Sequence, residues 1–295
     1  MNPKEAGISF VIPCYNCKKT INDTVKSILD LKLSKFEICM VDDGSKDNTW
    51  KMLQNYQKRY PKNVVIGRNA VNKGGAYTRN ECIKKSQYSW LFMIDADNYL
   101  DKASFFRLVD SVTGEDNVVS FQKIYFFYDI IFIDLVYIKW VFKKEKMEFN
   151  DLRRASHHPV VDGNYLFHRS VFDKVGGYDC YPEFGVLDTW SFGYKILLNG
   201  YSIKIVEDAF YYHRVVRNSY WLRGVKDFSN SLKSILLKYP YRFSEEEILN
   251  IKKSKDTQKT LVTLQNDFES EQVSWFFAAL LKIRNIFKNF NEKNN

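Results

Sequence analysis

Short apolar runs alternate with segments of helical periodicity through the first 110 residues of the chain. Between the first two runs, Ile21, Val25 and Ile28 recur at helical spacing. Thr20 and Asp23 are placed to form a capping box at the start of that helix. The apolar runs predict strands at residues 8–12, 36–41, 64–66 and 90–94. Strands that alternate with helices predict right-handed crossovers, and therefore an α/β fold with a mainly parallel sheet flanked by helices.

Polar clusters follow three of the predicted strands, at residues 13–16, 42–45 and 95–97, and Pro13 is expected to end the first strand. In parallel sheets, ligands bind beyond the carboxyl ends of the strands. Asp95 and Asp97 are two hard oxygen ligands of the kind that Mg²⁺ shares with water and substrate phosphates. One Asp-x-Asp also occurs in ordinary surface turns, but the agreement of three strand ends favours a metal–diphosphate site.

Other nucleotide-binding folds are disfavoured by the same strand ends. No Gly-x-Gly-x-x-Gly follows the first strand, and the chain contains no Walker sequence. A dehydrogenase or a P-loop enzyme is therefore not expected.

The composition is that of an ordinary globular protein with room for one large or two modest domains. The 295 residues are 45% hydrophobic, 27% charged and 16% aromatic. The net charge of +9 suits binding of phosphates, nucleic acid or anionic lipid, and equally a lysine-rich solvated surface. Nucleic-acid binding is the distant option, because the basic residues are not concentrated in one motif with aromatic residues.

The five cysteines favour a reduced, cytosolic protein, because their number is odd and Cys39 lies in an apolar strand pattern. Cys14 and Cys17 have Cys-x-x-Cys spacing, but no second such pair or histidine pair accompanies them, so a zinc site is not expected. The spacing leaves a redox role as a minor alternative. The first apolar run is too short for a signal peptide. Residues 124–142 carry three charged side chains and would make a poor membrane-spanning helix.

Four motifs occur in order: residues 8–16, Val-Asp-Asp-Gly-Ser-x-Asp-x-Thr at 41–49, Asn-x-Gly at 72–74 with Arg79-Asn80, and Asp-Ala-Asp at 95–97. Together they resemble the family 2 glycosyltransferases of bacteria, which have the GT-A fold. The likeness is close over about the first 110 residues and looser from about 160 to 215. It implies a nucleotide-sugar-binding half at 1–112 and an acceptor-binding and catalytic half at 113–222, and the pattern of the remaining residues predicts a helical C-terminal extension at 223–295.

The resemblance also implies a nucleotide pocket. A tyrosine face can stack on a base, and a carboxylate can accept from the ring N–H that uracil offers. Because UDP-sugars are the commonest donors in the family, the resemblance implies UDP as the nucleotide. Cationic donors match the oxygens of the diphosphate. One of Asp42 and Asp43 is expected to serve only the turn. The candidate nucleotide-binding residues are Pro13, Tyr15, Asn16, Asp43, Lys73, Arg79, Asp95 and Ala96.

Asp95 and Asp97 would hold Mn²⁺ or Mg²⁺, which neutralises the UDP leaving group. By resemblance, His213 stands where many GT-A enzymes have a third metal ligand, although a lone histidine is more often structural. Asn98 stands where many relatives have a further acid, and this difference is expected to alter contacts to the donor sugar.

The catalytic base would come from the second half. Relatives commonly carry Glu-Asp at the start of a helix, where this chain has Leu187-Asp188. Asp188 is then the candidate general base, because a helix N-terminus favours the ionised carboxylate. The alternative is that Asp188 only caps its helix. Family membership implies displacement with inversion at the anomeric carbon.

Two segments lie outside the close resemblance. Residues 121–149 are expected to form a buried helix on the acceptor side, with an aromatic acceptor groove or a membrane-facing surface as the alternative. The C-terminal part is helical in pattern and carries an apolar stripe at residues 276–290. That stripe suits an interfacial helix, packing on the core, or a homodimer contact.

The expected activity is transfer of a hexose or N-acetylhexosamine from a nucleotide diphosphate to a hydroxyl of a glycan or lipid-linked glycan. By resemblance, such enzymes often build cell-envelope polysaccharides. A cytoplasmic protein is expected, with peripheral contact at the inner face of the cell membrane as the alternative. The rival interpretations are a sugar nucleotidyltransferase and a non-catalytic subunit that binds sugar nucleotide or glycan. Absence of a Gly-rich, Arg/Lys-containing loop after the first strand disfavours the former, and Leu187 favours the latter.

Overall fold

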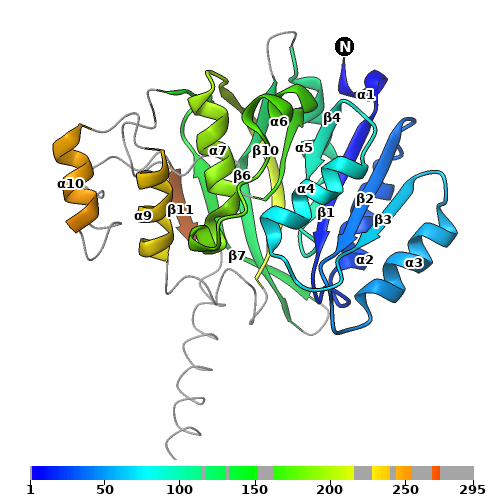
Figure 1. The fold of residues 1–295 in the computed structure, drawn as a ribbon. Coiled ribbons are helices and arrows are strands. Elements are labelled where there is room, and N and C mark those ends of the chain that lie inside the picture. Colours follow the sequence, from blue (N-terminus) through cyan, green and yellow to red (C-terminus); the bar gives the residue numbers. More distant parts are fainter. Residues whose placement is uncertain are drawn as a thin grey trace, which may run out of the picture.

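A computed structural model describes residues 2–113, 117–130, 133–149, 151, 163–215, 228–239, 244–253 and 268–272 (Figure 1). Its strands form one mixed sheet in the order β11-β7-β6-β9-β4-β1-β2-β3, and β10 pairs with β5, β6 and β8. Helices flank this sheet, which confirms the predicted α/β class.

The first part of the chain forms the parallel portion of the sheet. Strand β1 pairs in parallel with β2 and β4, and β2 pairs in parallel with β3. The elements of this part are α1 (Pro3–Ala6), β1 (Ile8–Cys14), α2 (Ile21–Leu29), β2 (Phe36–Asp42), α3 (Thr49–Arg59), β3 (Val64–Arg68), α4 (Gly75–Lys85), β4 (Trp90–Met93), β5 (Tyr99–Leu100) and α5 (Lys102–Asp110).

The second part extends the same sheet through antiparallel pairs. Strand β9 lies antiparallel between β4 and β6, while β10 runs parallel to β6. Its elements are β6 (Val118–Ile130), β7 (Ile133–Phe142), β8 (Lys146–Met147), β9 (Tyr165–His168), α6 (Arg169–Val175), the 3-10 helix η2 (Pro182–Leu187), α7 (Asp188–Leu198), β10 (Ile203–Arg214), α9 (Phe228–Lys238), α10 (Glu245–Lys253) and β11 (Phe268–Gln272).

The prediction of a helix within residues 121–149 is wrong. The segment forms the long antiparallel pair β6 and β7, which face each other from Lys123↔Val141 to Ile130↔Ile133. Its aromatic and β-branched residues suit strands, and the pairing gives them partners that a local pattern does not reveal.

Pro13 does not end the first strand, and β1 continues to Cys14. The ladder between β1 and β4 ends at Val11, so Pro13 pairs only with β2. A residue without an N–H is tolerated where the strand has already lost its neighbour on one side.

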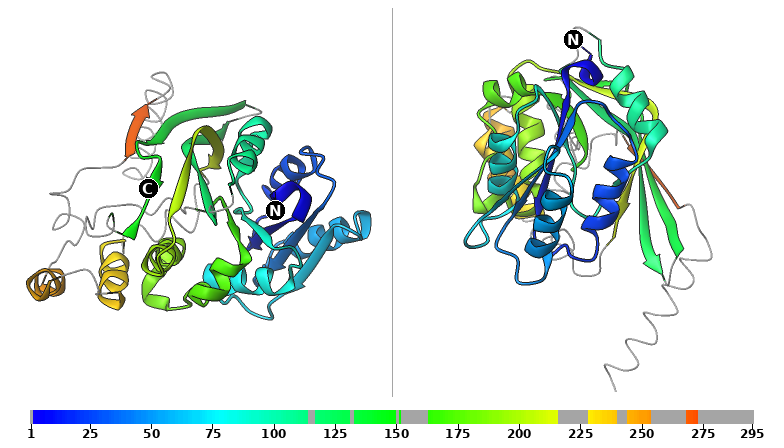
Figure 2. Two further views of the ribbon diagram at one scale, coloured as in Figure 1. Left: turned by 90° about the horizontal axis from the view of Figure 1, so that it is seen from above. Right: turned by 90° about the vertical axis from the view of Figure 1, so that its right-hand side faces the viewer.

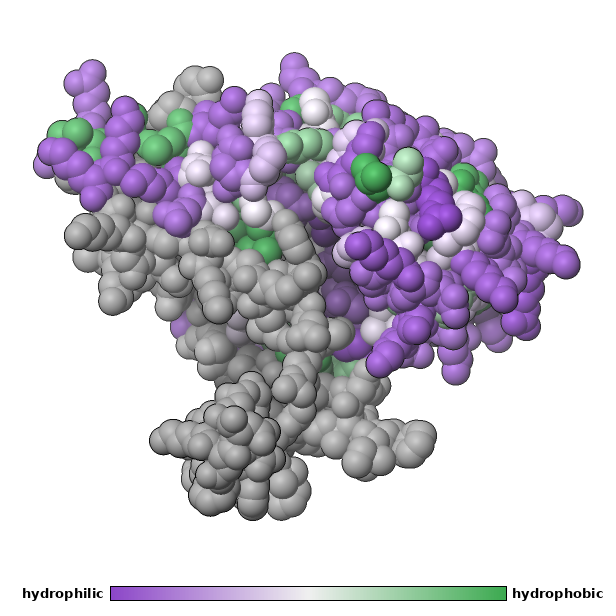
Figure 3. All heavy atoms as spheres, turned by 60° about the horizontal axis from the view of Figure 1, so that its bottom comes forward, coloured by the Kyte–Doolittle hydropathy of each residue, from purple (hydrophilic) through white to green (hydrophobic). Residues whose placement is uncertain are grey.

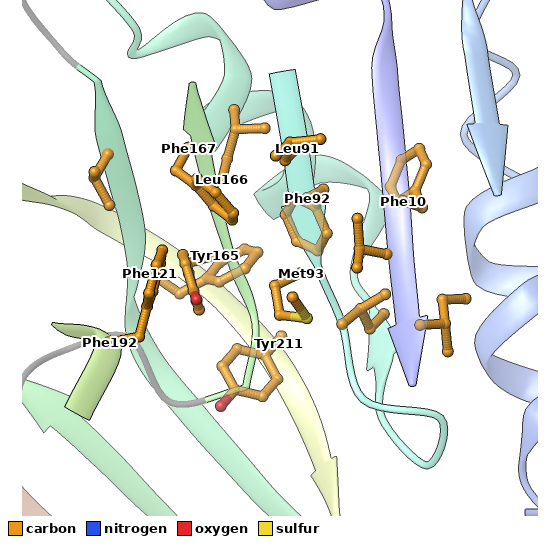
Figure 4. Close-up of a cluster of buried hydrophobic side chains, with 14 of the residues drawn as sticks. Phe10, Leu91, Phe92, Met93, Phe121, Tyr165, Leu166, Phe167, Phe192 and Tyr211 are labelled. Carbon is orange, nitrogen blue, oxygen red and sulfur yellow. The ribbon is translucent and has the colours of Figure 1, made fainter. Parts of the chain in front are cut away.

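Helices cover both faces of the sheet. The views in Figure 2 place α4, α6 and α7 on one face, and α2 and α5 on the other. Between them lies an aromatic core in which Phe10 is 5.5 Å from Phe92 between ring centroids, and Phe167 is 5.6 Å from Phe192 (Figure 4). Burial of such large rings is a main source of stability, and it holds the strand ends in fixed positions.

The C-terminal extension is helical in α9 and α10, but its last described element, β11, is a strand that pairs with β7. The apolar stripe at 276–290 lies outside the described residues. Among the helices that the structure describes, none is long and apolar enough to cross a membrane. The division of the chain at residue 112 stays a prediction, and the sheet runs across it through β4, β9 and β6.

Candidate functional site

The loops after β1, β2 and β4 meet at one edge of the sheet, where β10 also ends. Figure 3 brings this edge toward the viewer and shows a hollow beside which the described surface is mostly hydrophilic. The candidate residues from both parts of the chain therefore surround the carboxyl ends of parallel strands, where ligands bind in such sheets.

The turn from Asp95 to Asn98 follows β4 and is fixed by residues outside it. The backbone N–H of Asp95 donates to Asn164 Oδ1 at 3.2 Å. Thr20 Oγ1 donates to the carbonyl oxygen of Ala96 at 2.9 Å. The prediction that Thr20 caps α2 through its side chain is wrong, because its hydroxyl makes no capping hydrogen bond to that helix. Instead, Thr20 orients the turn that presents the two aspartates.

Arg214, at the end of β10, binds the same turn from the other side. Its Nε donates to the carbonyl oxygen of Asp97 at 3.1 Å, and its Nη2 lies 2.6 Å from Asp23 Oδ2. Its backbone N–H donates to Asn98 Oδ1 at 3.2 Å. The Asn98 side chain is fully buried, so this residue contributes to the shape of the turn.

Arg79 joins the two parts of the site. Its Nη2 donates to Asp95 Oδ1 at 2.8 Å, and its Nη1 forms an ion pair with Asp188 Oδ2. The structure therefore brings together three residues that the sequence predicted separately. Burial by itself would lower the pKa of Arg79, but Asp188 and Asp95 outweigh it and raise that pKa above its ordinary value.

Two glycines leave room for these charged groups. A Cβ at Gly75 would lie 2.7 Å from both Arg79 Nη1 and Asp188 Oδ2. A Cβ at Gly163 would collide with Asp95 Oδ2, and Gly163 also has a φ of +82°, which disfavours other residues.

Asp43 organises the loop that leads into α4. Its Oδ1 accepts from the backbone N–H of Lys73 at 2.9 Å and from Asn69 Nδ2 at 2.7 Å, and its Oδ2 accepts from the N–H of Gly74 at 2.9 Å. Lys73 Nζ lies 4.5 Å from the centroid of the Tyr77 ring. Contact of Asp43 with a base and of Lys73 with a diphosphate both stay predictions.

The turn after β1 presents an exposed aromatic ring. Asn16 has a φ of +49°, and it binds the loop after β2: its N–H donates to Ser45 Oγ at 2.8 Å, and its Oδ1 accepts from the N–H of Lys46 at 2.9 Å. Tyr15 is 40% exposed beside this anchored residue. The ring is therefore available for stacking, while Asn16 and the half-buried Pro13 hold the backbone.

Asp97 and His213 carry the features of a cation site. Burial and the neighbouring Asp95 raise the pKa of Asp97 to about 6, while His213 acts in the opposite direction. His213 Nδ1 is buried and finds no hydrogen-bond partner among the described residues. In that same part of the chain, no three histidine, cysteine or carboxylate side chains come together as a ready ligand set. The residues fit a cation that takes further ligands from phosphate and water.

The cysteine pair beside Tyr15 is buried. Cys14 and Cys17 are free thiols, and burial together with Cys17 raises the pKa of Cys14 well above its ordinary value. A high pKa leaves little thiolate, which argues against the redox role that the spacing allowed.

The sequence assigned no role to three positioning groups: Asn164, Arg214 and the Asn80 side chain. Asn80 Nδ2 donates to the carbonyl oxygen of Tyr178 at 2.9 Å, and its Oδ1 accepts from the N–H of Tyr178 at 2.9 Å. The signal for Asn80 was present, because it follows Arg79 within a recognised motif. Arg214 carried no signal beyond its place next to His213.

Comparison with known proteins decides the family. The family model described as "Glycosyl transferase family 2" matches residues 9–176, which is more than half of the chain. The chain belongs to glycosyltransferase family 2. This confirms the resemblance found in the sequence motifs.

The matches to curated relatives cover about a third of the chain. The poly-beta-1,6-N-acetyl-D-glucosamine synthase of Staphylococcus epidermidis is 36% identical over 104 residues, which are 35% of this chain and 25% of that protein. The synthase of the same name from Staphylococcus aureus (strain COL) is 32% identical over 105 residues, again with 25% of its length covered. The match thus spans about a quarter of the length of these relatives.

Solved structures match more of the chain. S. aureus TarS 1–349 in complex with UDP-GlcNAc has a TM-score of 0.60 at 19% identity, with 85% of this chain and 73% of that chain covered. The mannosyltransferase PcManGT from Pyrobaculum calidifontis, in complex with GDP-Man and Mn²⁺, has a TM-score of 0.59 at 17% identity, with 83% and 68% covered. These similarities establish the GT-A fold.

Proposed function

We propose that this chain transfers a sugar from a UDP-linked donor to a hydroxyl of a glycan or lipid-linked glycan, with N-acetylglucosamine as the first choice of sugar. The observation that carries the proposal is the Asp95–Arg79–Asp188 contact, which joins the donor side to the candidate base. Relatives named for poly-N-acetylglucosamine synthesis and a neighbour bound to UDP-GlcNAc support the choice of donor.

In this mechanism Tyr15 stacks on the uracil, and the loop held by Asp43 shapes the pocket around the nucleotide. Asp188 accepts the proton of the acceptor hydroxyl as that oxygen attacks the anomeric carbon. The bond from the anomeric carbon to the diphosphate breaks, and its electron pair leaves with UDP. Attack from the side opposite the leaving group inverts the anomeric centre.

Asp95 and Asp97 would hold Mn²⁺ or Mg²⁺, with His213 Nδ1 as a further candidate ligand. A divalent cation bound there would neutralise the charge that develops on the departing diphosphate. The surrounding turn is held from both sides by Thr20 and Arg214, so the two carboxylates are oriented before a ligand arrives.

A different donor is the second candidate, because one structural neighbour is bound to GDP-Man. Family membership disfavours the nucleotidyltransferase interpretation.

A non-catalytic subunit would retain the fold without a functional catalytic base. Leu187 is fully buried and contributes no carboxylate, so the distinction depends on Asp188.

The proposal is tested by incubating the chain with UDP-GlcNAc, other UDP-sugars and GDP-mannose, with Mn²⁺ or with chelator, and short N-acetylglucosamine oligomers as acceptors. Released nucleotide and extended oligomer are measured, together with calorimetric binding of UDP. Metal-dependent release from UDP-GlcNAc with oligomer extension supports the proposal. Release of nucleotide from GDP-mannose alone would make GDP-mannose the donor. Binding of UDP without turnover of any donor would support the non-catalytic subunit.

A further inference from the structure

The guanidinium of Arg79 lies between carboxylates from two parts of the chain. Nη1 is paired with Asp188 and Nη2 with Asp95, and the residue is only 8% exposed. Its Nε is buried without a hydrogen-bond partner among the described residues. A cation with both ends engaged in this way is poorly placed to bind a diphosphate, which was the role predicted from the sequence.

The surroundings of Arg79 maintain this arrangement. Its Cζ lies 5.9 Å from the centroid of the Tyr178 ring, whose backbone is held at both its N–H and its carbonyl oxygen by Asn80. Gly75 supplies the space on the other side, because a Cβ there would be 2.7 Å from both atoms of the Arg79–Asp188 pair. The ion pair is therefore enclosed by residues of α4 and by the segment that precedes α7.

Both oxygens of Asp188 are engaged. Oδ2 accepts from Arg79, and Oδ1 accepts from the backbone N–H of Thr189 at 2.9 Å. These two contacts fix the plane of the carboxylate, while each oxygen keeps a lone pair for a further donor. A charged carboxylate that is 8% exposed needs such compensation, and the cation supplies it.

We propose that Arg79 is a positioning residue that holds Asp188 ionised and oriented to receive the proton of the acceptor hydroxyl, and that it ties this base to Asp95 on the donor side. This inference rests on the proposed function. In this inference Arg79 acts on the proton transfer and does not contact the diphosphate. Loss of Arg79 should therefore lower kcat and leave the Kd for UDP unchanged.

The decisive variant is Gly75→Ala, because it retains every charge. Gly75 is the first residue of α4 and does not have a positive φ, so alanine suits its backbone. The added methyl group displaces the Arg79–Asp188 pair. Gly67→Ala is the matched control: its φ is also not positive, and its added Cβ meets mainly the flexible end of Lys85. Arg79→Lys keeps the positive charge but loses the planar group that donates to two carboxylates at once, and Arg59→Lys on α3 is its control.

Steady-state release of UDP from UDP-GlcNAc with an oligomer acceptor and calorimetric Kd values for UDP are measured on all variants, after thermal unfolding has shown that they are folded. We expect kcat to fall about 100-fold in Gly75→Ala and Arg79→Lys, as for a misplaced catalytic group, with the Kd for UDP within about twofold of the wild type. Guanidinium ion added to Arg79→Ala should restore part of kcat.

Two results overturn the inference. A Kd for UDP that rises in step with the loss of activity in Arg79→Lys makes Arg79 a nucleotide ligand, and wild-type kcat in a folded Gly75→Ala shows that the pair does not position the base. If Arg79→Lys fails to fold, Gly75→Ala decides alone. A wild type that releases no nucleotide from any donor overturns the proposed function and this inference together, which distinguishes that failure from the other two.

Discussion

The backbone N–H of Arg214 donates to Asn98 Oδ1 at 3.2 Å, across 116 positions of sequence. This bond joins the end of β10 to the turn that follows β4. The side chain of Arg214 adds bonds to the Asp97 carbonyl oxygen and to Asp23. The geometry of the two candidate metal ligands therefore depends on a strand from the second part of the sheet.

Replacement of Arg214 should loosen this turn. Arg214→Met keeps much of the apolar stem but leaves the Asp97 carbonyl oxygen without the guanidinium donor. We expect a loss of about 1.5–3 kcal/mol in the free energy of unfolding, as for hydrogen bonds to charged groups. UDP affinity in Mn²⁺ should fall as well. Urea unfolding and calorimetry check both effects, with Arg59→Met as the control. If Arg214→Met keeps the wild-type stability and UDP affinity, the turn is held without Arg214.

Asp43 should prove necessary for the loop that begins α4. In Asp43→Asn an NH₂ group must face one of the N–H donors of Lys73, Gly74 or Asn69, which leaves a partly buried donor unsatisfied. We expect a stability loss of about 1–3 kcal/mol and weaker UDP binding. Urea unfolding of this variant is compared with Asp30→Asn, an exposed carboxylate. Unchanged stability with lost UDP binding would point to direct contact with the base instead.

Much of the first part of the fold could be predicted because its elements have strong local boundaries. Gly74 and Gly75 mark the start of α4, and an abrupt change from apolar to charged residues marks the end of β4. The pair β6 and β7 could not be predicted in this way. Its residues lack a single period, and its partners are distant in sequence, so only pairing determines that they are strands.

The same distinction applies to the site. Asp95, Arg79 and Asp188 were identified from motifs, because each motif has a fixed local pattern. The partners of Arg79 could not be predicted, since the convergence of residues 79, 95 and 188 depends on packing of α4 against α7. Chemistry alone suggested phosphate for an arginine near a nucleotide site, whereas the structure pairs it with two carboxylates.

Tyr15 should contribute to nucleotide binding without contributing to stability. The residue is 40% exposed, so Tyr15→Ala removes little buried surface. Stacking of a base on an aromatic ring is worth about 1–3 kcal/mol, so the Kd for UDP should rise about 5- to 150-fold, while Tyr15→Phe should bind nearly as the wild type. Tyr181 is also 40% exposed and serves as the control. Equal UDP affinities for Tyr15→Ala and Tyr181→Ala would remove Tyr15 from the nucleotide pocket.

Asp188 should be required for turnover and dispensable for UDP binding. Asp188→Asn keeps the size of the side chain but removes its proton-accepting ability, so we expect kcat to fall about 10²- to 10⁴-fold, as for loss of a general base. The Kd for UDP should stay near that of the wild type, because Asp188 enters from α7.

The control for this variant is Asp179→Asn. Asp179 lies in the segment before α7 and forms an ion pair at 3.0 Å with Lys195 of that helix, which the substitution removes. Loss of this ion pair should lower the thermal unfolding midpoint, while kcat should fall much less than in Asp188→Asn. Release of UDP, extension of the acceptor and unfolding are measured on both variants. Wild-type turnover by a folded Asp188→Asn would mean that another group takes the proton, whereas equal losses of kcat in both variants would reduce Asp188 to a structural residue of its helix.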